Sequence, residues 1–434
     1  MNSTSRKTSA LLPYGLTAVS FLAAGQAHGQ SFLDQDWDIP VLPEQLYEET
    51  VAGGPTDGIV TLTLDGEART SYQTNIYGGP SSTAVSSLVF EASPRANLRI
   101  NTGRIEGRIQ VGADYTRYLA NSANDQLDLF VRANMNFNVN DQLTIRTAAA
   151  VVQNEVGISN NTTVPNLTPI ETRTETRTTA EIGADYDGQA FDVSATLGVD
   201  VFRNNGLQQT NFPLAPIDNS LRDRTRLYAN LEATNQLSNG NEMFGGFSGA
   251  LIRYENEGTD EKRDSIEISP YLGIRTESAD GTLVAEGSTG FIYRDFESTQ
   301  YDAVFTPSLD ANVRWRPVGS GGEITASTST TLEDATSSGV GATIVQDFEV
   351  AATFEPVEQL KLTGGLAGAY SLSNTSDAFG GGRDSDFTIR PSVDAQYFLS
   401  DTFYVGANAY YEQEFGGSSS ESDLGIGLSA GLSY

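Results

Sequence analysis

The chain lacks cysteine altogether, and its single histidine is His28, close to the amino terminus. Without cysteine it forms no disulfides and carries no cysteine-linked lipid anchor. Ser-His-Asp and Cys-His nucleophile systems, and metal sites built from histidine or cysteine, are unavailable to the rest of the chain. Paired carboxylates could still do acid-base work, but acidic residues occur throughout and no spacing singles out a pair. We therefore expect no enzyme, no metal site and no cofactor.

Positive charge is also scarce, because 26 Lys and Arg residues face 56 Asp and Glu residues, and the formal net charge is −30. Contacts to phosphates need a cationic surface, so we expect no binding to nucleic acid. Long hydrophobic runs are missing as well: beyond the amino terminus no segment approaches the ~18 apolar residues of a membrane-spanning helix. A membrane barrel is not excluded, since its strands show only alternating apolarity.

The amino terminus has the composition of a secretory signal peptide. Arg6 and Lys7 precede a mostly apolar run at 10–24, and small residues around Ala27 offer a cleavage site. The run is too short to cross a bilayer as a helix. We predict a signal peptide over residues 1–29, followed by an acidic, largely unstructured periplasmic leader over residues 30–57, which has no Lys or Arg.

From residue 59 onward apolar and polar residues alternate. In "VTLTLDGEARTSYQTNI" (60–76) every charged residue falls on one phase, and the pattern recurs at 127–139, 191–201, 305–315 and 387–397. The whole chain gives roughly eighteen such segments, within a range of about 16 to 18, many of them longer than the ~9–11 residues that a tilted membrane strand needs.

The connections between these segments alternate in length. Longer polar stretches separate tight turns near 101–103, 140–142, 187–189, 238–241, 279–281, 318–322, 356–359 and 400–401. A Greek-key sandwich would not sort its loops so regularly. We therefore predict an all-β fold: a transmembrane up-and-down antiparallel β-barrel over residues 58–434, with short periplasmic turns and longer extracellular loops, in the bacterial outer membrane.

Four of the predicted strands contain a proline on the apolar phase: Pro94, Pro270, Pro307 and Pro391. Proline cannot donate to a strand ladder. All four prolines lie on strands that run from a long loop toward a tight turn, in the outer half of the wall. We predict a bulge or a local break in strand pairing at each of them.

From about residue 58 to its end the chain resembles the type 2 putative β-barrel porins of Gram-negative bacteria. The resemblance is closest in "GFIYRDFESTQYDAVFTPSLDANVRWRP" (290–317) and "TTLEDATSSGVG" (330–341). It implies an outer-membrane barrel with a channel role and identifies no substrate. The last strand alternates and stops at Tyr434, which resembles the carboxy-terminal signal for the barrel assembly machinery. We expect that machinery, outer-membrane lipid and lipopolysaccharide as partners.

A barrel of about 16 to 18 strands is wide enough to enclose an aqueous channel. Its polar phase supplies the candidate channel-lining residues, which are Arg95, Arg99, Arg104, Arg108, Arg132, Arg146, Glu175, Glu181, Asp185, Asp192, Asp200, Arg224 and Arg226. A cationic wall beside an acidic wall would orient dipolar solutes. Alternatively, and in our preferred interpretation, these charges pair across strands and stiffen the wall.

Inward-phase aromatic residues allow two interpretations as well. Tyr228, Tyr271, Tyr404 and Tyr410 could form a sliding surface for sugars, but we favour ordinary wall residues. Two functions remain open at this stage. The first is a channel for passive diffusion of small hydrophilic solutes, and the alternative is a non-conducting barrel with a structural, adhesive or surface-polysaccharide-handling role.

Overall fold

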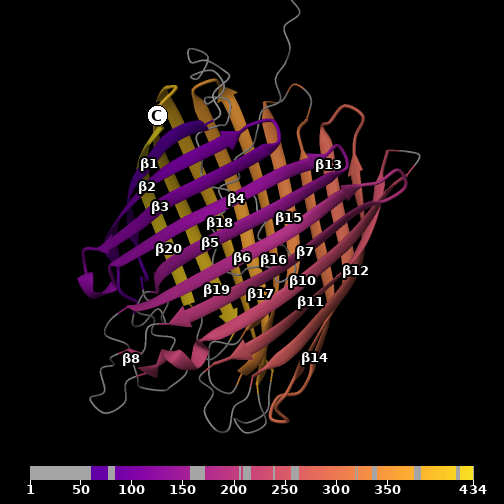
Figure 1. Cartoon of the computed structure of the whole chain (residues 1–434). Helices are drawn as coiled ribbons and strands as arrows, with labels where there is room; N and C mark the ends of the chain where they lie inside the picture. Colours follow the sequence, from indigo (N-terminus) through magenta and orange to yellow (C-terminus); the bar gives the residue numbers. More distant parts are fainter. Residues whose placement is uncertain are drawn as a thin grey trace, which may run out of the picture.

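Eighteen strands form one antiparallel sheet that closes on itself, as the computed structural model shows (Figure 1). The structure describes residues 60–76, 84–156, 172–204, 207–208, 217–237, 240–255, 263–317, 319, 321–334, 340–375, 383–416 and 421–433. The predicted signal peptide (1–29), the predicted leader (30–57) and Tyr434 lie outside the described residues. The first strand begins at Val60, close to the predicted start of the barrel.

The first half of the barrel consists of β1 (Val60–Gln73), β2 (Ser87–Asn101), β3 (Ile105–Tyr118), β4 (Gln126–Asn140), β5 (Leu143–Val156), β6 (Arg173–Asp187), β7 (Asp192–Asn204), β10 (Arg224–Gln236) and β11 (Glu242–Tyr254). The second half consists of β12 (Ser265–Glu277), β13 (Leu283–Phe296), β14 (Val304–Trp315), β15 (Gly322–Asp334), β16 (Val340–Val357), β17 (Leu360–Thr375), β18 (Arg383–Ser400), β19 (Phe403–Gly416) and β20 (Glu421–Ser433).

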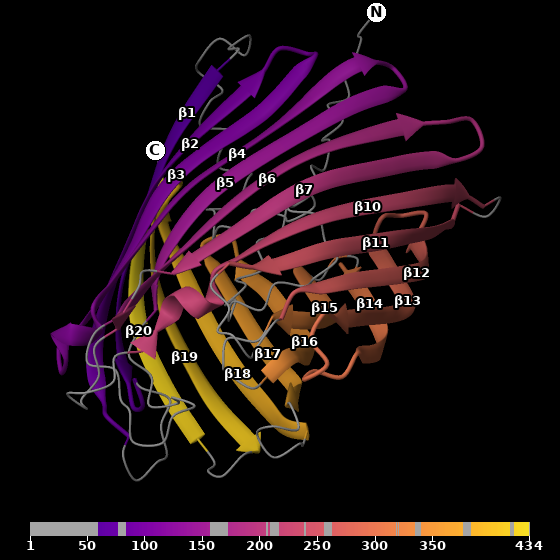
Figure 2. The same ribbon diagram turned by 60° about the horizontal axis from the view of Figure 1, so that its bottom comes forward.

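Each barrel strand pairs with the next barrel strand along the chain, and β1 pairs with β20 to close the cylinder (Figure 2). The connection between β7 and β10 carries a separate two-stranded sheet, β8 (Leu207–Gln208) with β9 (Ile217–Asp218), and the 3-10 helix η2 (Asn219–Arg222). A second 3-10 helix, η1 (Ser122–Asn124), lies between β3 and β4. No helix in the described part of the chain is long and apolar enough to cross a membrane.

The two ends of the barrel differ in their connections, as the sequence predicted. We call them the short-turn end and the long-loop end. The short-turn end contains all eight predicted tight turns, for example the two residues between β4 and β5 and between β16 and β17. In the turn after β2 the Asn101 side chain accepts a hydrogen bond from the Gly103 N–H at 3.0 Å, and Gly103 adopts a φ of 77°, which favours glycine.

Alternation of side chains along each strand produces an apolar outer surface and a polar inner surface. Leu62, Leu197, Phe305 and Leu428 project from four different strands and each keeps more than half of its surface exposed. The opposite phase of the same strands carries the polar residues, for example Asp65 and Glu67 on β1 and Asp192 and Asp200 on β7. This outward exposure of large apolar side chains is what a barrel wall in contact with lipid requires. The final strand follows the same pattern up to Leu432.

The predicted breaks in strand pairing are confirmed, and they occur without a shift in register. In β2, Ala92 pairs with Tyr115 and Arg95 with Gly112, while pairing is interrupted at Pro94 between them. The same interruption occurs at Pro270 between β12 and β13 and at Pro391 between β18 and β19. In each case pairing to the preceding strand continues, so the proline faces the following strand with its missing N–H.

Restoring the missing donor at Pro391 provides a test of this explanation. Because the pairing around Pro391 keeps its register, Pro391→Thr is expected to re-form one ladder hydrogen bond and raise the free energy of unfolding by about 1 kcal/mol. Urea unfolding in phospholipid vesicles measures this change. Val393→Thr, two residues further along the same outward phase, is the matched control and should give no such gain. Equal stability of wild type and Pro391→Thr would contradict the explanation.

The seam between β14 and β15 is incomplete over a longer stretch. Its ladder contains only the pairs from Ala311–Thr328 to Trp315–Ile324, at the short-turn end. Beside this seam lies the buried apolar cluster of the described residues, which consists of Ile292, Phe296, Tyr301, Val304, Leu332 and Ala342 with Ile344 packed against it. A packed apolar core in the wall of a polar-lined barrel indicates that two layers overlap there.

Candidate functional site

The inner wall of the barrel is the candidate functional surface, and the structure places twelve of the thirteen predicted lining residues in strands with their side chains on the inward phase. Arg104 is the exception. It lies in the turn between β2 and β3, where it is exposed, so its assignment to the wall was wrong. The turn lies one residue later than the predicted 101–103, because β2 extends to Asn101 and β3 begins only at Ile105.

Seven of the thirteen predicted residues form ion pairs, and four of them (Arg95, Arg146, Asp185 and Asp200) pair with a neighbouring strand. Arg95 on β2 lies 3.2 Å from Asp114 on β3. Arg146 on β5 lies 2.5 Å from Asp185 on β6. The remaining ion pairs of predicted residues are Arg177–Asp200 between β6 and β7, Arg224–Asp334 from β10 to β15, Arg226–Glu267 from β10 to β12, and Glu175–Arg173 within β6. These paired arginines and carboxylates neutralise one another locally.

Four other predicted residues act differently. Arg132 lies 5.0 Å from the ring centre of Phe130, an inward aromatic that Arg95 also approaches at 5.7 Å. Arg108 donates to the side chain of Asn97 at 3.2 Å and stands directly opposite Arg99 in the ladder. Asp192 accepts a hydrogen bond from the N–H of Gly188 at 3.1 Å and so stabilises the turn before β7.

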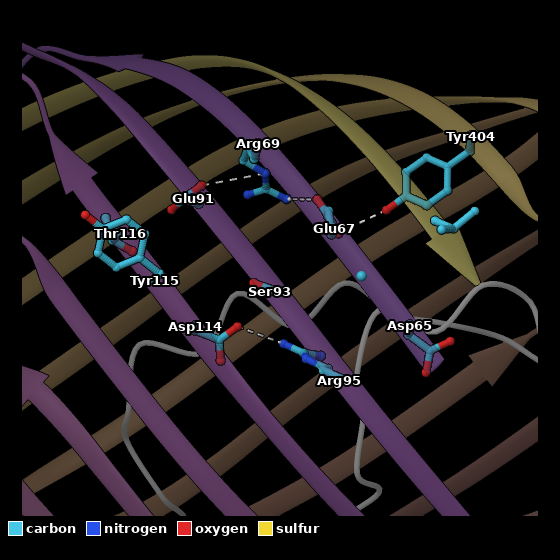
Figure 3. Close-up of a pocket in the computed structure, with 12 residues that line it drawn as sticks. Asp65, Glu67, Arg69, Glu91, Ser93, Arg95, Asp114, Tyr115, Thr116 and Tyr404 are labelled. Atoms are coloured by element: carbon cyan, nitrogen blue, oxygen red, sulfur yellow. Dashed lines mark hydrogen bonds and ion pairs between the residues drawn. The ribbon is translucent and has the colours of Figure 1, made fainter. Parts of the chain in front are cut away.

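A recess of about 260 Å³ opens in the inner wall where β1, β2 and β3 meet β19 and β20 (Figure 3). Carboxylates and guanidinium groups alternate across it. Arg69 contacts Glu67 at 3.3 Å and Glu91 at 3.8 Å, and Tyr404 donates a hydrogen bond to Glu67 at 3.0 Å. Every charged residue that lines the recess comes from the inward phase of β1 to β3. The recess can hold water and small polar solutes.

The inward tyrosines lie flat against the wall, each over a glycine of a neighbouring strand. Tyr228 covers Gly198, Tyr271 covers Gly246, and Tyr404 and Tyr410 cover Gly431 and Gly425. Each hydroxyl donates to a carboxylate; the pairs are Tyr228–Glu181, Tyr271–Glu232, Tyr404–Glu67 and Tyr410–Asp423. These rings fill the wall, which agrees with our preferred interpretation of the four tyrosines as ordinary wall residues.

The packing of Tyr228 against Gly198 is expected to contribute to stability. A Cβ at position 198 would overlap the ring of Tyr228, so Gly198→Ala is expected to lower the free energy of unfolding by about 1–3 kcal/mol. Tyr228→Phe keeps the ring but removes the donor to buried Glu181, with a cost of similar size, ~1–3 kcal/mol. Gly364→Ala is the control, since no atom lies within 4 Å of its Cβ. Urea unfolding in vesicles distinguishes these variants, and equal effects at 198 and 364 would contradict the packing argument.

A buried charge network lies at the long-loop end of β10 to β15. The guanidinium group of Arg294 is fully enclosed and contacts Glu267 at 2.6 Å and Asp334 at 2.7 Å. Arg226 contacts the same Glu267, and Arg224 contacts the same Asp334 at 2.6 Å. Among these five residues three cations face two carboxylates. The sequence analysis identified Arg224 and Arg226 but missed Arg294, Glu267 and Asp334.

Two connections beside this network each carry an arginine, Arg222 between β7 and β10 and Arg263 between β11 and β12. Arg222 ends η2 and lies just before β10. Burial, together with the nearby charge of Arg173, lowers the pKa of Arg222 to about 10. Arg263 stacks on the ring of Tyr254 at 4.4 Å. Arg222 and Arg263 thus add guanidinium groups near the network, beside the carboxylates Asp223 and Asp264 of the same connections.

The opposite wall, from β14 to β20, is acidic, and the sequence analysis missed it. Its inward phase carries Asp310, Glu333, Asp347, Glu349, Asp394, Glu412 and Glu414. The cations on the inward phase of the described part of these strands are Arg314, Lys361 and Arg390, and Arg390 lies 3.6 Å from Glu412. Carboxylates therefore dominate this side of the lumen. Counting inward-phase charges strand by strand would have found this wall from the sequence.

A family model described as "Putative beta-barrel porin 2" matches residues 57–428. No curated protein matches the chain. Among solved structures, the FrpB iron transporter from Neisseria meningitidis is similar at 9% identity and a TM-score of 0.47, covering 85% of this chain and 63% of that chain. Copper transporter OprC is similar at 10% identity and a TM-score of 0.49, covering 87% and 81%. The outer membrane protein opdK from Pseudomonas aeruginosa is similar at 10% identity and a TM-score of 0.45, covering 86% and 99%.

Proposed function

Because this chain belongs to the family described as "Putative beta-barrel porin 2" and is a protein of the bacterial outer membrane, we propose that it is a channel for passive diffusion of small hydrophilic solutes, with a preference for cations. The observation that carries this proposal is the inner face of an 18-stranded closed cylinder, which carries polar side chains on every strand. A cylinder of that strand number is wide enough for an aqueous lumen.

The preference for cations follows from the acidic wall. On β14 to β20 carboxylates outnumber guanidinium and ammonium groups, whereas β2 to β7 carry charges of both signs, several of them in ion pairs. Rings and rows of carboxylates raise the local concentration of cations in a pore. Paired charges contribute little to this field because they cancel at short range.

Conductance of the purified protein in a planar lipid bilayer tests the proposal. Stable single-channel openings are expected, and the reversal potential in a salt gradient should show that cations pass more readily than anions. Folding is checked separately by the heat-dependent shift in electrophoretic mobility of membrane barrels. Persistent electrical silence of folded protein would contradict the proposal and favour the alternative, a non-conducting barrel with a structural, adhesive or surface-polysaccharide-handling role.

Two further expectations belong to this proposal. The protein is proposed to act without catalysis, in keeping with the description of its family as a porin. Its final strand, with outward Leu424, Ile426, Leu428 and Leu432, is proposed to be recognised by the barrel assembly machinery. By the usual orientation of outer-membrane barrels, the long-loop end faces outward and is surrounded by lipopolysaccharide.

A further inference from the structure

The seam between β14 and β15 differs from every other seam of the described barrel. Its ladder ends at the pair Ala311–Thr328, and the outer halves of the two strands, residues 304–310 and 329–334, have no ladder pairs with each other. The neighbouring seams are complete: β13 pairs with β14 up to Val304, and β15 pairs with β16 up to Asp334. The outer half of the wall therefore has no backbone ladder between β14 and β15, and we call this the parted stretch.

Two side chains prevent ladder formation in the parted stretch. The backbone of Leu309 faces β15, because its N–H donates to the hydroxyl of Thr330 at 2.9 Å. By alternation Pro307 faces the same way and has no N–H to offer. The N–H of Thr330 in turn approaches the side chain of Asp310 at 3.3 Å and finds no backbone partner on β14. Pro307 thus lacks a donor for the ladder, and the Thr330 hydroxyl takes the Leu309 N–H that a ladder hydrogen bond would use.

Past this point the tips of β15 and β16 (residues 329–334 and 340–345) lie on the inner side of β13 and β14. Inward-facing Arg294 of β13 donates to the carbonyl of Leu332 at 3.0 Å, and Leu332 and Ala342 are completely buried against Ile292 and Val304. We call this overlap the lap. It is held by apolar contact and by side chains, neither of which fixes a register as a ladder does.

The two ends of the lap differ chemically. On the membrane side, the outward rings of Phe291 and Phe305 lie next to each other at 5.3 Å beside the free edge of β14. On the lumen side, the lap ends at a group of three arginines, Arg294, Arg224 and Arg226, which share the carboxylates of Glu267 and Asp334. The lap therefore connects an apolar surface to an arginine-rich one.

We propose that the lap is a lateral passage between the lumen and the outer leaflet for single-chain anionic amphiphiles. The acyl chain passes between β14 and β15, and the anionic head points toward Arg224, Arg226 and Arg294. In lipid an unpaired strand edge is unfavourable, so a seam kept open by Pro307 and Thr330 indicates a function. Opening requires that the tips of β15 and β16 move away from β13 and β14. No ladder has to break, but the contacts of Arg294 to Asp334 and to the carbonyl of Leu332 do. This route is separate from the hydrophilic path along the barrel axis.

A disulfide across the parted stretch tests the passage, and the cysteine-free chain makes the experiment clean. Leu309 and Thr330 are adjacent across the seam, so L309C/T330C is expected to oxidise and to lock the lap. The matched control is T289C/L309C, which uses the same cysteine to join β13 to β14 where they are already paired. The probe is dodecanoate with a photoreactive group at the end of its chain, applied to the protein in lipid nanodiscs. Crosslinked residues are mapped by mass spectrometry.

Crosslinks to Leu332 and Ala342, which are buried at rest, are expected in the wild type and in the oxidised control. They should fall at least tenfold in oxidised L309C/T330C and return on reduction. The uncharged dodecanol probe should crosslink these residues several-fold less than dodecanoate. Ion conductance should be the same in the locked and control variants, which separates this passage from the axial channel. Three results would overturn the proposal: equal crosslinking in oxidised L309C/T330C and the control, no crosslinks to Leu332 or Ala342 in the wild type, or a loss of crosslinking that is accompanied by a loss of conductance.

Discussion

Neutralising three lumenal carboxylates, Asp347→Asn, Glu349→Gln and Asp394→Asn together, is expected to lower the cation-to-anion permeability ratio about fivefold. These groups lie on β16 and β18, on the inward phase of the acidic wall. One unit charge about 4 Å from an ion in bulk water contributes about 1 kcal/mol. Because salt screens each group, the three charges together are expected to contribute about this much, which corresponds to a factor of about five in relative permeation. Reversal potentials in a salt gradient across a planar bilayer measure the ratio.

A matched control removes the same charge outside the lumen. Asp141, Asp280 and Asp401 lie in tight turns at the short-turn end, between strands. Changing these three to asparagine alters the total charge equally but leaves the wall untouched. Because exposed charges are screened over about 8 Å at physiological salt, the control is expected to keep the wild-type ratio. A similar loss in both triple variants would show that total charge sets selectivity and that the acidic wall does not.

Replacing Arg294 by alanine is expected to lower the free energy of unfolding by about 3–5 kcal/mol, the usual cost of breaking a buried ion pair by removing one partner. Its guanidinium group is 1% exposed and bridges Glu267 and Asp334. Without it two buried carboxylates face each other with only Arg224 and Arg226 to compensate, and the lap loses its contact to the carbonyl of Leu332. Urea unfolding in phospholipid vesicles, followed by circular dichroism, measures the loss.

Arg253→Ala is the control for this prediction. Arg253 also contacts two carboxylates, Asp264 at 2.7 Å and Glu297 at 2.6 Å, but its side chain is 59% exposed at the long-loop end. Exposed pairs are screened by solvent and contribute little. We expect wild-type stability for Arg253→Ala. If both arginine variants unfold alike, burial is not the reason for the effect at Arg294.

The barrel itself could be predicted from the sequence because its cause is local. A period of two between apolar and polar residues fixes which face of each strand meets lipid, and glycine, asparagine and aspartate mark the turns. The effect of Pro94, Pro270 and Pro391 is equally local, because each removes one donor from one ladder. The number of strands and the alternation of short and long connections could be read from the same periodicity and turn residues.

The lap could not be predicted in this way. Leu332 and Ala342 continue the outward phase of β15 and β16, so alternation alone assigns them to the lipid surface. They are buried because the strand tips fold inside β13, a tertiary arrangement that depends on Arg294, Glu267 and Asp334 meeting from three different strands. Nothing in the spacing of these three residues brings them together. Likewise, ion pairing between β5 and β6 follows from the register, which places Arg146 near Asp185.

Accessibility along one strand tests the central claim most directly: a closed cylinder with lipid outside and water inside. Single cysteines at residues 392 to 397 of β18, each carrying a fluorescent label, are examined in vesicles with brominated lipids and with iodide. We expect iodide to quench labels at Ser392, Asp394 and Gln396, and brominated lipid to quench those at Val393, Ala395 and Tyr397. Quenching by lipid at Asp394, or the absence of any alternation along the strand, would contradict the account.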